Sequence, residues 1–193
     1  MAPPELTTEQ TAINLMLASI GERPVNNIGA SQRLDVIRAV ATLNEVSLLV
    51  QGRGWWFNEE TEVVHSVNAE GEYVLDPHAV KVDASDKSIT KFVKRGTKLY
   101  NTVTRTTTGH TDDLELDYVL LLTFDDMPES AKLYIARRAG VIFQTRSVGS
   151  PTLFEFTERD AQEAWGALQM EELEHVDTNL TFAPGIVDAV WNR

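Results

Sequence analysis

Acidic doublets are the residues of this sequence whose types and spacing could carry catalysis. Two carboxylates held roughly 5 to 9.5 Å apart across a cleft can hydrolyse a glycosidic bond. The adjacent acids of this chain are Glu59-Glu60, Asp112-Asp113, Asp125-Asp126 and Glu171-Glu172. Neighbouring residues in a strand point to opposite faces, so no doublet supplies such a pair by itself. Helix caps, turns and solvated faces explain these doublets better than catalysis does.

Histidines, cysteines and glycines predict no metal or nucleotide site. His65, His78, His110 and His175 are scattered, and none has a spacing typical of zinc ligands. The sequence has no cysteine, which excludes disulfides, thiolate catalysis and cysteine-ligated metals. Gly52-Arg53-Gly54 lacks the third glycine of a dinucleotide-binding loop, and it does not open a helix. We therefore expect no catalytic residue, no bound metal and no cofactor.

The stretch from Gln51 to Glu60 is where the character of the chain changes. A long helical pattern ends at Gly52 and Gly54, since glycine tolerates the left-handed conformation that closes helices. Three aromatic residues follow at once, namely Trp55, Trp56 and Phe57. Strand alternation would place the first and third rings on one face and the second ring on the other. We expect this junction to pack between two layers or against a second chain, and to dominate stability.

Composition is that of a globular protein of ordinary size. A chain of 193 residues is long enough for one domain, or for one domain with a sizeable insertion. No apolar run approaches the roughly 20 residues that span a bilayer. The first residues lack the basic start and apolar run of a signal peptide. We expect neither export nor association with a membrane.

Charge is strongly negative and unevenly distributed. A formal net charge of -12 argues against tight binding to duplex DNA, because that affinity comes mostly from Lys and Arg contacts with phosphates. Basic residues predominate from Lys81 to Arg105, and acidic residues predominate from Glu155 to Asp177. The simpler interpretation is two solvated faces. The alternative is that these unlike surfaces meet between neighbouring copies.

Apolar spacing predicts two helices before the junction. The first is capped by Thr7 or Thr8 and runs to about Ile20. The second begins near Ser31 and has more apolar residues than one stripe requires. Packing within the subunit and contact with another subunit both explain this surplus.

After the junction the pattern becomes predominantly strand-like up to Phe124, with short turns that favour antiparallel pairing. The continuously apolar run from Tyr118 to Leu122 predicts a central strand, or one covered on both faces.

Two more helices are expected after the strands. Asp126 is predicted to cap the third helix, with Pro128 in its first turn. A fourth helix with an acidic outer face is expected from about Thr157 to Glu174. Its buried side, or the positions near it, should hold Ala161, Trp165, Leu168 and Leu173. Residues 177–193 are apolar enough to dock on another surface.

These elements together predict an α+β protein. A helical bundle built from both chain ends, residues 1–54 and 125–193, is interrupted by a mostly antiparallel β domain, residues 55–124. Insertions are tolerated where their two ends lie close together, so Trp55 and Asp125 should be neighbours at the root of that domain.

Four segments of this chain occur in the order found in one viral family. They are residues 17–25, residues 53–60 (Arg-Gly-Trp-x-Phe-Asn), residues 125–129 (Asp-x-Met-Pro-Glu), and the helix from Ala131 to Gln144 with Gly149-Ser150-Pro151 after it. On these motifs the chain resembles the tail tubular protein A, or gatekeeper, family of short-tailed bacteriophages. The resemblance covers most of the chain. The loop at 26–32 is shorter than expected, the β segment matches loosely, and residues after Asp177 match poorly.

The resemblance implies a structural adaptor in the virion tail and no enzyme. Members form a dodecameric ring between the portal and a nozzle of the tail tubular protein B type, assembled in the host cytoplasm. The ring extends the channel that double-stranded DNA passes through without specific binding, for genome retention and ejection. Candidate channel-facing acids are Glu158, Glu163, Glu171 and Glu174, and candidate interface residues are Lys91, Lys94, Arg95, Phe182 and Trp191. The alternative is a tail-associated glycan or peptidoglycan hydrolase using carboxylates.

Overall fold

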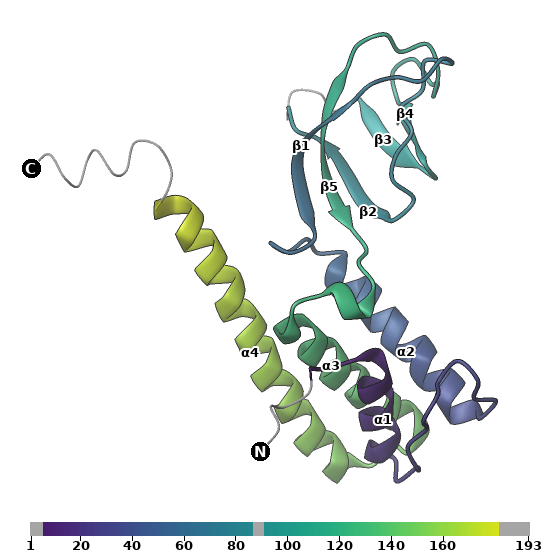
Figure 1. Ribbon diagram of the computed structural model, residues 1–193, viewed down its shortest axis with the longest axis vertical. Helices are drawn as coiled ribbons and strands as arrows, with labels where there is room; N and C mark the ends of the chain where they lie inside the picture. The colour runs from purple at the N-terminus through teal and green to yellow at the C-terminus, as the bar shows by residue number, and fades with distance from the viewer. Residues whose placement is uncertain (1–5, 87–90, 182–193) are drawn as a thin grey trace, which may run out of the picture. The chain divides into compact units, whose positions relative to one another are not determined.

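A computed structural model describes residues 6–86 and 91–181, with side chains described up to residue 175. Its helices and antiparallel sheets confirm the predicted α+β class (Figure 1). The chain forms two compact units, which we call the helical unit (Met1–Leu48 with Thr123–Arg193) and the β unit (Leu49–Leu122). The boundaries expected from the sequence, after residues 54 and 124, lie slightly further along the chain.

The N-terminal helices of the helical unit begin close to their predicted positions. Helix α1 spans Glu9–Ser19, and Thr8 is its N-cap, with the Thr8 hydroxyl accepting a hydrogen bond from the backbone of Thr11. Helix α2 spans Leu34–Gln51 and therefore starts slightly after Ser31. The predicted helix end before Gly52 is confirmed.

The C-terminal helices differ more from their predicted bounds. Helix α3 spans Glu129–Ser147, after the short 3-10 helix η1 at Phe124–Asp126. Helix α4 spans Pro151–Thr181, so the predicted start at Thr157 and end at Glu174 are both wrong. Proline opens a helix without losing a hydrogen bond, because the first amides have no partner inside the helix. Pro151 therefore begins α4 instead of preceding it.

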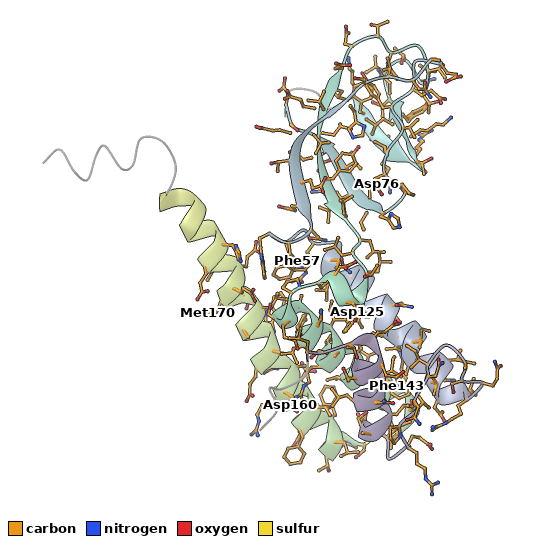
Figure 2. The ribbon with its side chains drawn as sticks, in the orientation of Figure 1. Phe57, Asp76, Asp125, Phe143, Asp160 and Met170 are labelled. Atoms are coloured by element: carbon orange, nitrogen blue, oxygen red, sulfur yellow. The ribbon has the colours of Figure 1, made fainter. Side chains whose placement is uncertain are left out.

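Buried apolar side chains from all four helices form the core of the helical unit, where α3 packs against both α1 and α4. Phe143 of α3 is among the largest of them (Figure 2). On α4, Ala161 and Leu168 are buried as predicted. Leu173 is 62% exposed, so its predicted place near the buried side is wrong. Trp165 is half-buried, with its ring centroid 4.8 Å from that of Tyr134.

Five strands form the β unit. The strands are β1 (Glu59–His65), β2 (Ala79–Ala84), β3 (Phe92–Arg95), β4 (Lys98–Asn101) and β5 (Leu114–Leu120). One antiparallel sheet has the order β1-β5-β2, and β3 pairs with β4 in a hairpin. Tyr118 of β5 pairs with Glu60 on one side and with Val82 on the other. The predicted central strand is thereby confirmed, although it ends at Leu120.

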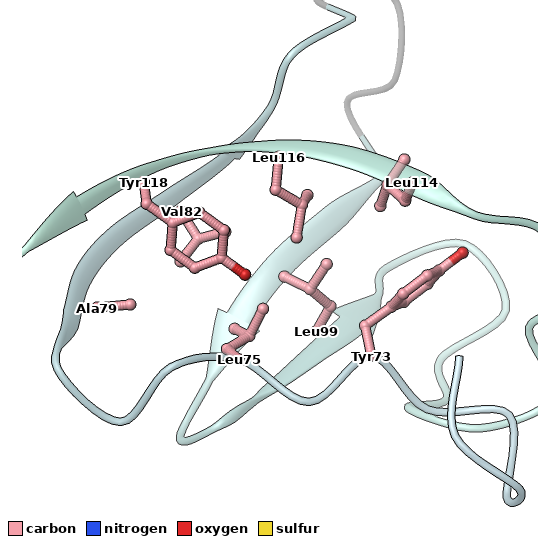
Figure 3. Packing of buried hydrophobic residues seen from close by; sticks show 8 residues of the cluster. All are labelled: Tyr73, Leu75, Ala79, Val82, Leu99, Leu114, Leu116 and Tyr118. Carbon is pink, nitrogen blue, oxygen red and sulfur yellow. The ribbon is translucent and has the colours of Figure 1, made fainter. Parts of the chain in front are cut away.

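The core of the β unit lies between the sheet and the hairpin. Its buried residues are Tyr73, Leu75, Ala79, Val82, Leu99, Leu114, Leu116 and Tyr118 (Figure 3). The hydroxyl of Tyr73 donates a hydrogen bond of 2.7 Å to the backbone carbonyl of Asp112, so the polar end of this ring is satisfied. Residues 102–108 form turns, with one isolated bridge between Asn101 and Thr106.

Candidate functional site

The aromatic residues after α2 form a turn, which corrects the expectation of a strand. The backbone carbonyl of Trp55 accepts hydrogen bonds of 3.0 Å from the amides of Asn58 and Glu59, and β1 begins only at Glu59. The rings of Trp55 and Phe57 are nearly parallel at 6.4 Å, and Trp56 stands almost perpendicular to both. Trp55 is only 6% exposed, whereas the other two rings are half-buried.

Only one of the two glycines before this turn has a left-handed backbone. Gly54 has φ of 84°, and a Cβ atom there would lie 2.1 Å from Oε1 of Glu59. Gly52 is not among the glycines with positive φ, so the predicted left-handed role is wrong for Gly52. Gly54 therefore places Trp55 next to the end of α2, where the indole Nε1 donates a hydrogen bond of 2.7 Å to the carbonyl of Val50.

Two buried amide side chains, Gln51 and Asn58, connect the two ends of the β unit. Asn58 Nδ2 donates to the carbonyls of Gln51 (3.0 Å) and Leu120 (2.7 Å), and its Oδ1 accepts from the Trp55 amide (2.9 Å). Gln51 Oε1 accepts from the Leu122 amide at 2.8 Å, and its Nε2 donates back to the Leu122 carbonyl at 3.2 Å. Sequence reasoning missed both roles, although Asn58 ends the Arg-Gly-Trp-x-Phe-Asn signature. The signal available in the sequence was a polar residue, Asn58, directly after three aromatic residues.

The predicted cap of α3 is wrong. Asp126 accepts a hydrogen bond of 2.6 Å from the hydroxyl of Thr123, and η1 ends before α3 begins. Pro128 is the N-cap residue, outside the first turn, and α3 has no side-chain cap at its start. The neighbouring acids instead accept hydrogen bonds from backbone amides at the start of α1. Glu129 accepts from the amide of Thr7 at 3.0 Å and also from its hydroxyl, and Asp125 accepts from the amide of Glu9 at 3.3 Å.

The candidate channel-facing acids have different surroundings on α4. Glu158 pairs with Arg138 at 3.0 Å, next to a second ion pair of 2.6 Å between Arg137 and Asp160. Glu163 and Glu174 are exposed, and Glu171 is half-buried. At 3.6 residues per turn, Glu163 and Glu174 share a face, whereas Glu158 lies near the buried side. Their place at a channel wall stays a prediction.

The candidate basic residues in β3 and directly before it make contacts within the β unit. Lys94 donates a hydrogen bond to the carbonyl of Ala79, and the guanidinium of Arg95 lies 3.5 Å from the ring centroid of Tyr100. Lys91 lies 5.4 Å from the ring centroid of Phe92. Their use at an interface between chains stays a prediction. Phe182 and Trp191, the other two candidates, lie outside the described residues.

One histidine has a contact with a chemical consequence. Nε2 of His65 lies 2.7 Å from the hydroxyl of Tyr118. Burial lowers the pKa of His65 and raises the pKa of Tyr118 to about 12, because both charged forms would be poorly solvated there. Among the side chains described, those of residues 6–86 and 91–175, no three of His, Asp or Glu gather as metal ligands. None of the helices described is both long and apolar enough to cross a membrane.

Comparison with known proteins gives one assignment. A search of curated proteins finds no match to this chain. The model of the tail tubular protein family matches residues 10–178, which include parts of both the helical unit and the β unit. The match also includes the aromatic turn and the Asp-x-Met-Pro-Glu motif. Since one family model accounts for most of the chain, this protein belongs to the tail tubular protein family of bacteriophages.

Proposed function

We propose that this structural protein of the phage tail forms a ring that joins the portal to the tail nozzle. The observation that carries the proposal is the family match over residues 10–178. Exposed apolar side chains on α2 and α4 agree with it, because each copy in a ring must bury surface against two neighbours. A ring of twelve copies, assembled in the host cytoplasm, is the form that the resemblance implies.

The same proposal assigns the ring a channel for double-stranded DNA. A net charge of -12 supports passage without adhesion, since phosphates are repelled by an acidic protein. Retention and ejection of the genome then depend on how the ring joins its two partners.

Electron microscopy of reconstituted assemblies tests the ring. The purified protein is imaged alone and after mixing with portal assemblies of the same phage, and light scattering gives the mass of each species. Rings stacked on portals are the expected result. A protein that stays monomeric alone is compatible with the proposal, because a partner can template assembly. A protein that never joins portals contradicts it.

No specific observation favours the hydrolase alternative. Both carboxylates of the Asp125-Asp126 doublet accept hydrogen bonds at helix ends, which is a structural role. Turnover of purified cell wall, lost on replacement of a defined pair of acids, would be needed to revive that alternative.

A further inference from the structure

Helix α2 has an apolar stripe on the side opposite its buried face. The stripe consists of Leu34, Ile37, Ala41 and Leu48, and its three larger side chains are 48–57% exposed. Successive separations of three, four and seven residues keep these positions on one side of a helix. The buried face of the same helix is formed by Val36, Ala39, Leu43 and Val46. We call the exposed set the α2 stripe.

Helix α4 has a second apolar stripe on its outer side. It consists of Phe156, Gly166, Met170 and Leu173, and its three larger side chains are 61–62% exposed. At 3.6 residues per turn these positions lie opposite Ala161 and Leu168, which face the core. Figure 2 labels Met170 on this helix. We call this set the α4 stripe.

The two stripes are suited to each other in shape. At about 1.5 Å per residue, the α2 stripe is about 21 Å long and the α4 stripe about 26 Å. The larger side chains of one helix can pack into the space left by small residues of the other, as in knobs-into-holes packing. Gly166 and the exposed Ala167 leave such space on α4, and Ala41 leaves it on α2.

Charge favours the pairing of unlike stripes over like ones. Arg38 lies beside Ile37 on the exposed side of α2, and no described residue forms an ion pair with it. The exposed acid on the same side, Glu45, is already paired with Arg146 at 2.7 Å. Glu163 lies between Phe156 and Met170 on α4, and it too has no ion pair among the described residues. On this face Glu163 would meet the next copy instead of the channel. Arg159 is on the same face of α4, but the exposed acids Glu155, Glu163 and Glu174 outnumber it. Contact between two α4 stripes would therefore oppose acid with acid.

We infer that the α2 stripe of one copy packs against the α4 stripe of the next copy. This inference rests on the proposed ring and names the surfaces that would build it. Helices α2 and α4 lie on different flanks of the helical unit, with α3 between them (Figure 1). A contact between two different surfaces is head-to-tail. A pair of copies then keeps a free α2 stripe at one end and a free α4 stripe at the other. Further copies can therefore add until the ring closes.

Crosslinking through introduced cysteines tests the inference, because the natural chain has no cysteine. Ile37→Cys and Met170→Cys are placed in one chain, assembled on portals and treated with a short bismaleimide. The expected result is a ladder of dimers, trimers and larger species on a denaturing gel. Each single variant alone should give no crosslink, whereas a mixture of the two single variants should give dimers.

A matched control uses an exposed apolar residue outside both stripes. Val148, at the end of α3, is 54% exposed, and Val148→Cys combined with Met170→Cys should give no ladder. Ala41→Cys with Ala167→Cys, which lies beside Gly166 of the α4 stripe, provides the second stripe pair with smaller changes in side-chain volume. Both pairs are checked for an unchanged urea midpoint before assembly.

The outcomes separate this inference from the proposed function. Rings that form on portals without a ladder from either stripe pair would overturn the inference and leave the ring intact. Dimers from Ile37→Cys alone or Met170→Cys alone would show like-with-like pairing and would also overturn it. Failure of the natural chain to join portals would instead contradict the proposed function.

Discussion

At the scale of single residues, Asn58 holds together the aromatic turn. Asn58→Ala would remove the donor to two carbonyls and the acceptor for the Trp55 amide, all in a buried region. Unsatisfied buried polar groups cost about 1–3 kcal/mol each, so we expect a loss of at least that size. Urea unfolding measures it. Asn26→Ala, at an exposed position, is the matched control and should change stability by about 0.5 kcal/mol or less.

His65 should make the stability of the β unit depend on pH. Its pKa is lowered in the folded chain, so below about 6.5 the unfolded chain binds more protons than the folded one. The contribution of His65 to the free energy of unfolding is therefore fully present above that pH, and it is lost as the pH falls through the pKa of His65 in the folded chain. His65→Gln should flatten this component in urea unfolding between about pH 7.5 and 5. Parallel curves for the natural and variant chains would contradict the prediction, and exposed His78→Gln is the control.

At the scale of elements, the start of α1 depends on acids that follow the β unit in the sequence. Glu129→Ala should cost about 0.5–2 kcal/mol, because the Thr7 amide loses its acceptor near the positive end of α1. Asp126→Ala should cost less, because Asp126 caps no α-helix. Urea unfolding of both variants makes the comparison. An equal or larger loss for Asp126→Ala would contradict this ranking of the two acids.

At the scale of the whole molecule, the β unit should fold as a separate domain. Gln51 and Asn58 hydrogen-bond to Leu120 and Leu122, so the two ends of this unit are held together within it. We expect a fragment of residues 49–122 to give strand-type circular dichroism and a cooperative unfolding transition. A fragment without a cooperative transition would mean that this unit needs the rest of the chain.

The assembled ring should bind duplex DNA only weakly. Each chain has a net charge of -12, so the ring attracts DNA phosphates only weakly. Gel shifts at low salt should leave DNA free in the presence of rings on portals, with portals alone as the control. Tight, salt-sensitive binding that requires this protein would contradict the acidic channel.

Local patterns in the sequence determined the fold class and the family. Alternation, helical spacing and turn residues are properties of neighbouring positions, so they were sufficient to predict the four helices and the central strand. Arg-Gly-Trp-x-Phe-Asn and Asp-x-Met-Pro-Glu pointed to the tail tubular family, which the match over residues 10–178 confirms. Both inferences used short segments whose meaning does not depend on distant contacts.

Only the tertiary structure decided which polar group meets which. Asp126 has the sequence context of a helix cap, but Thr123 binds it, and Glu129 and Asp125 accept amides from a segment more than 100 residues away in the chain. The sequence also left undecided which side of α2 is exposed, because apolar residues lie on more than one side of this helix. Burial depends on which helices pack nearby, and that information lies in long-range contacts that no local pattern contains.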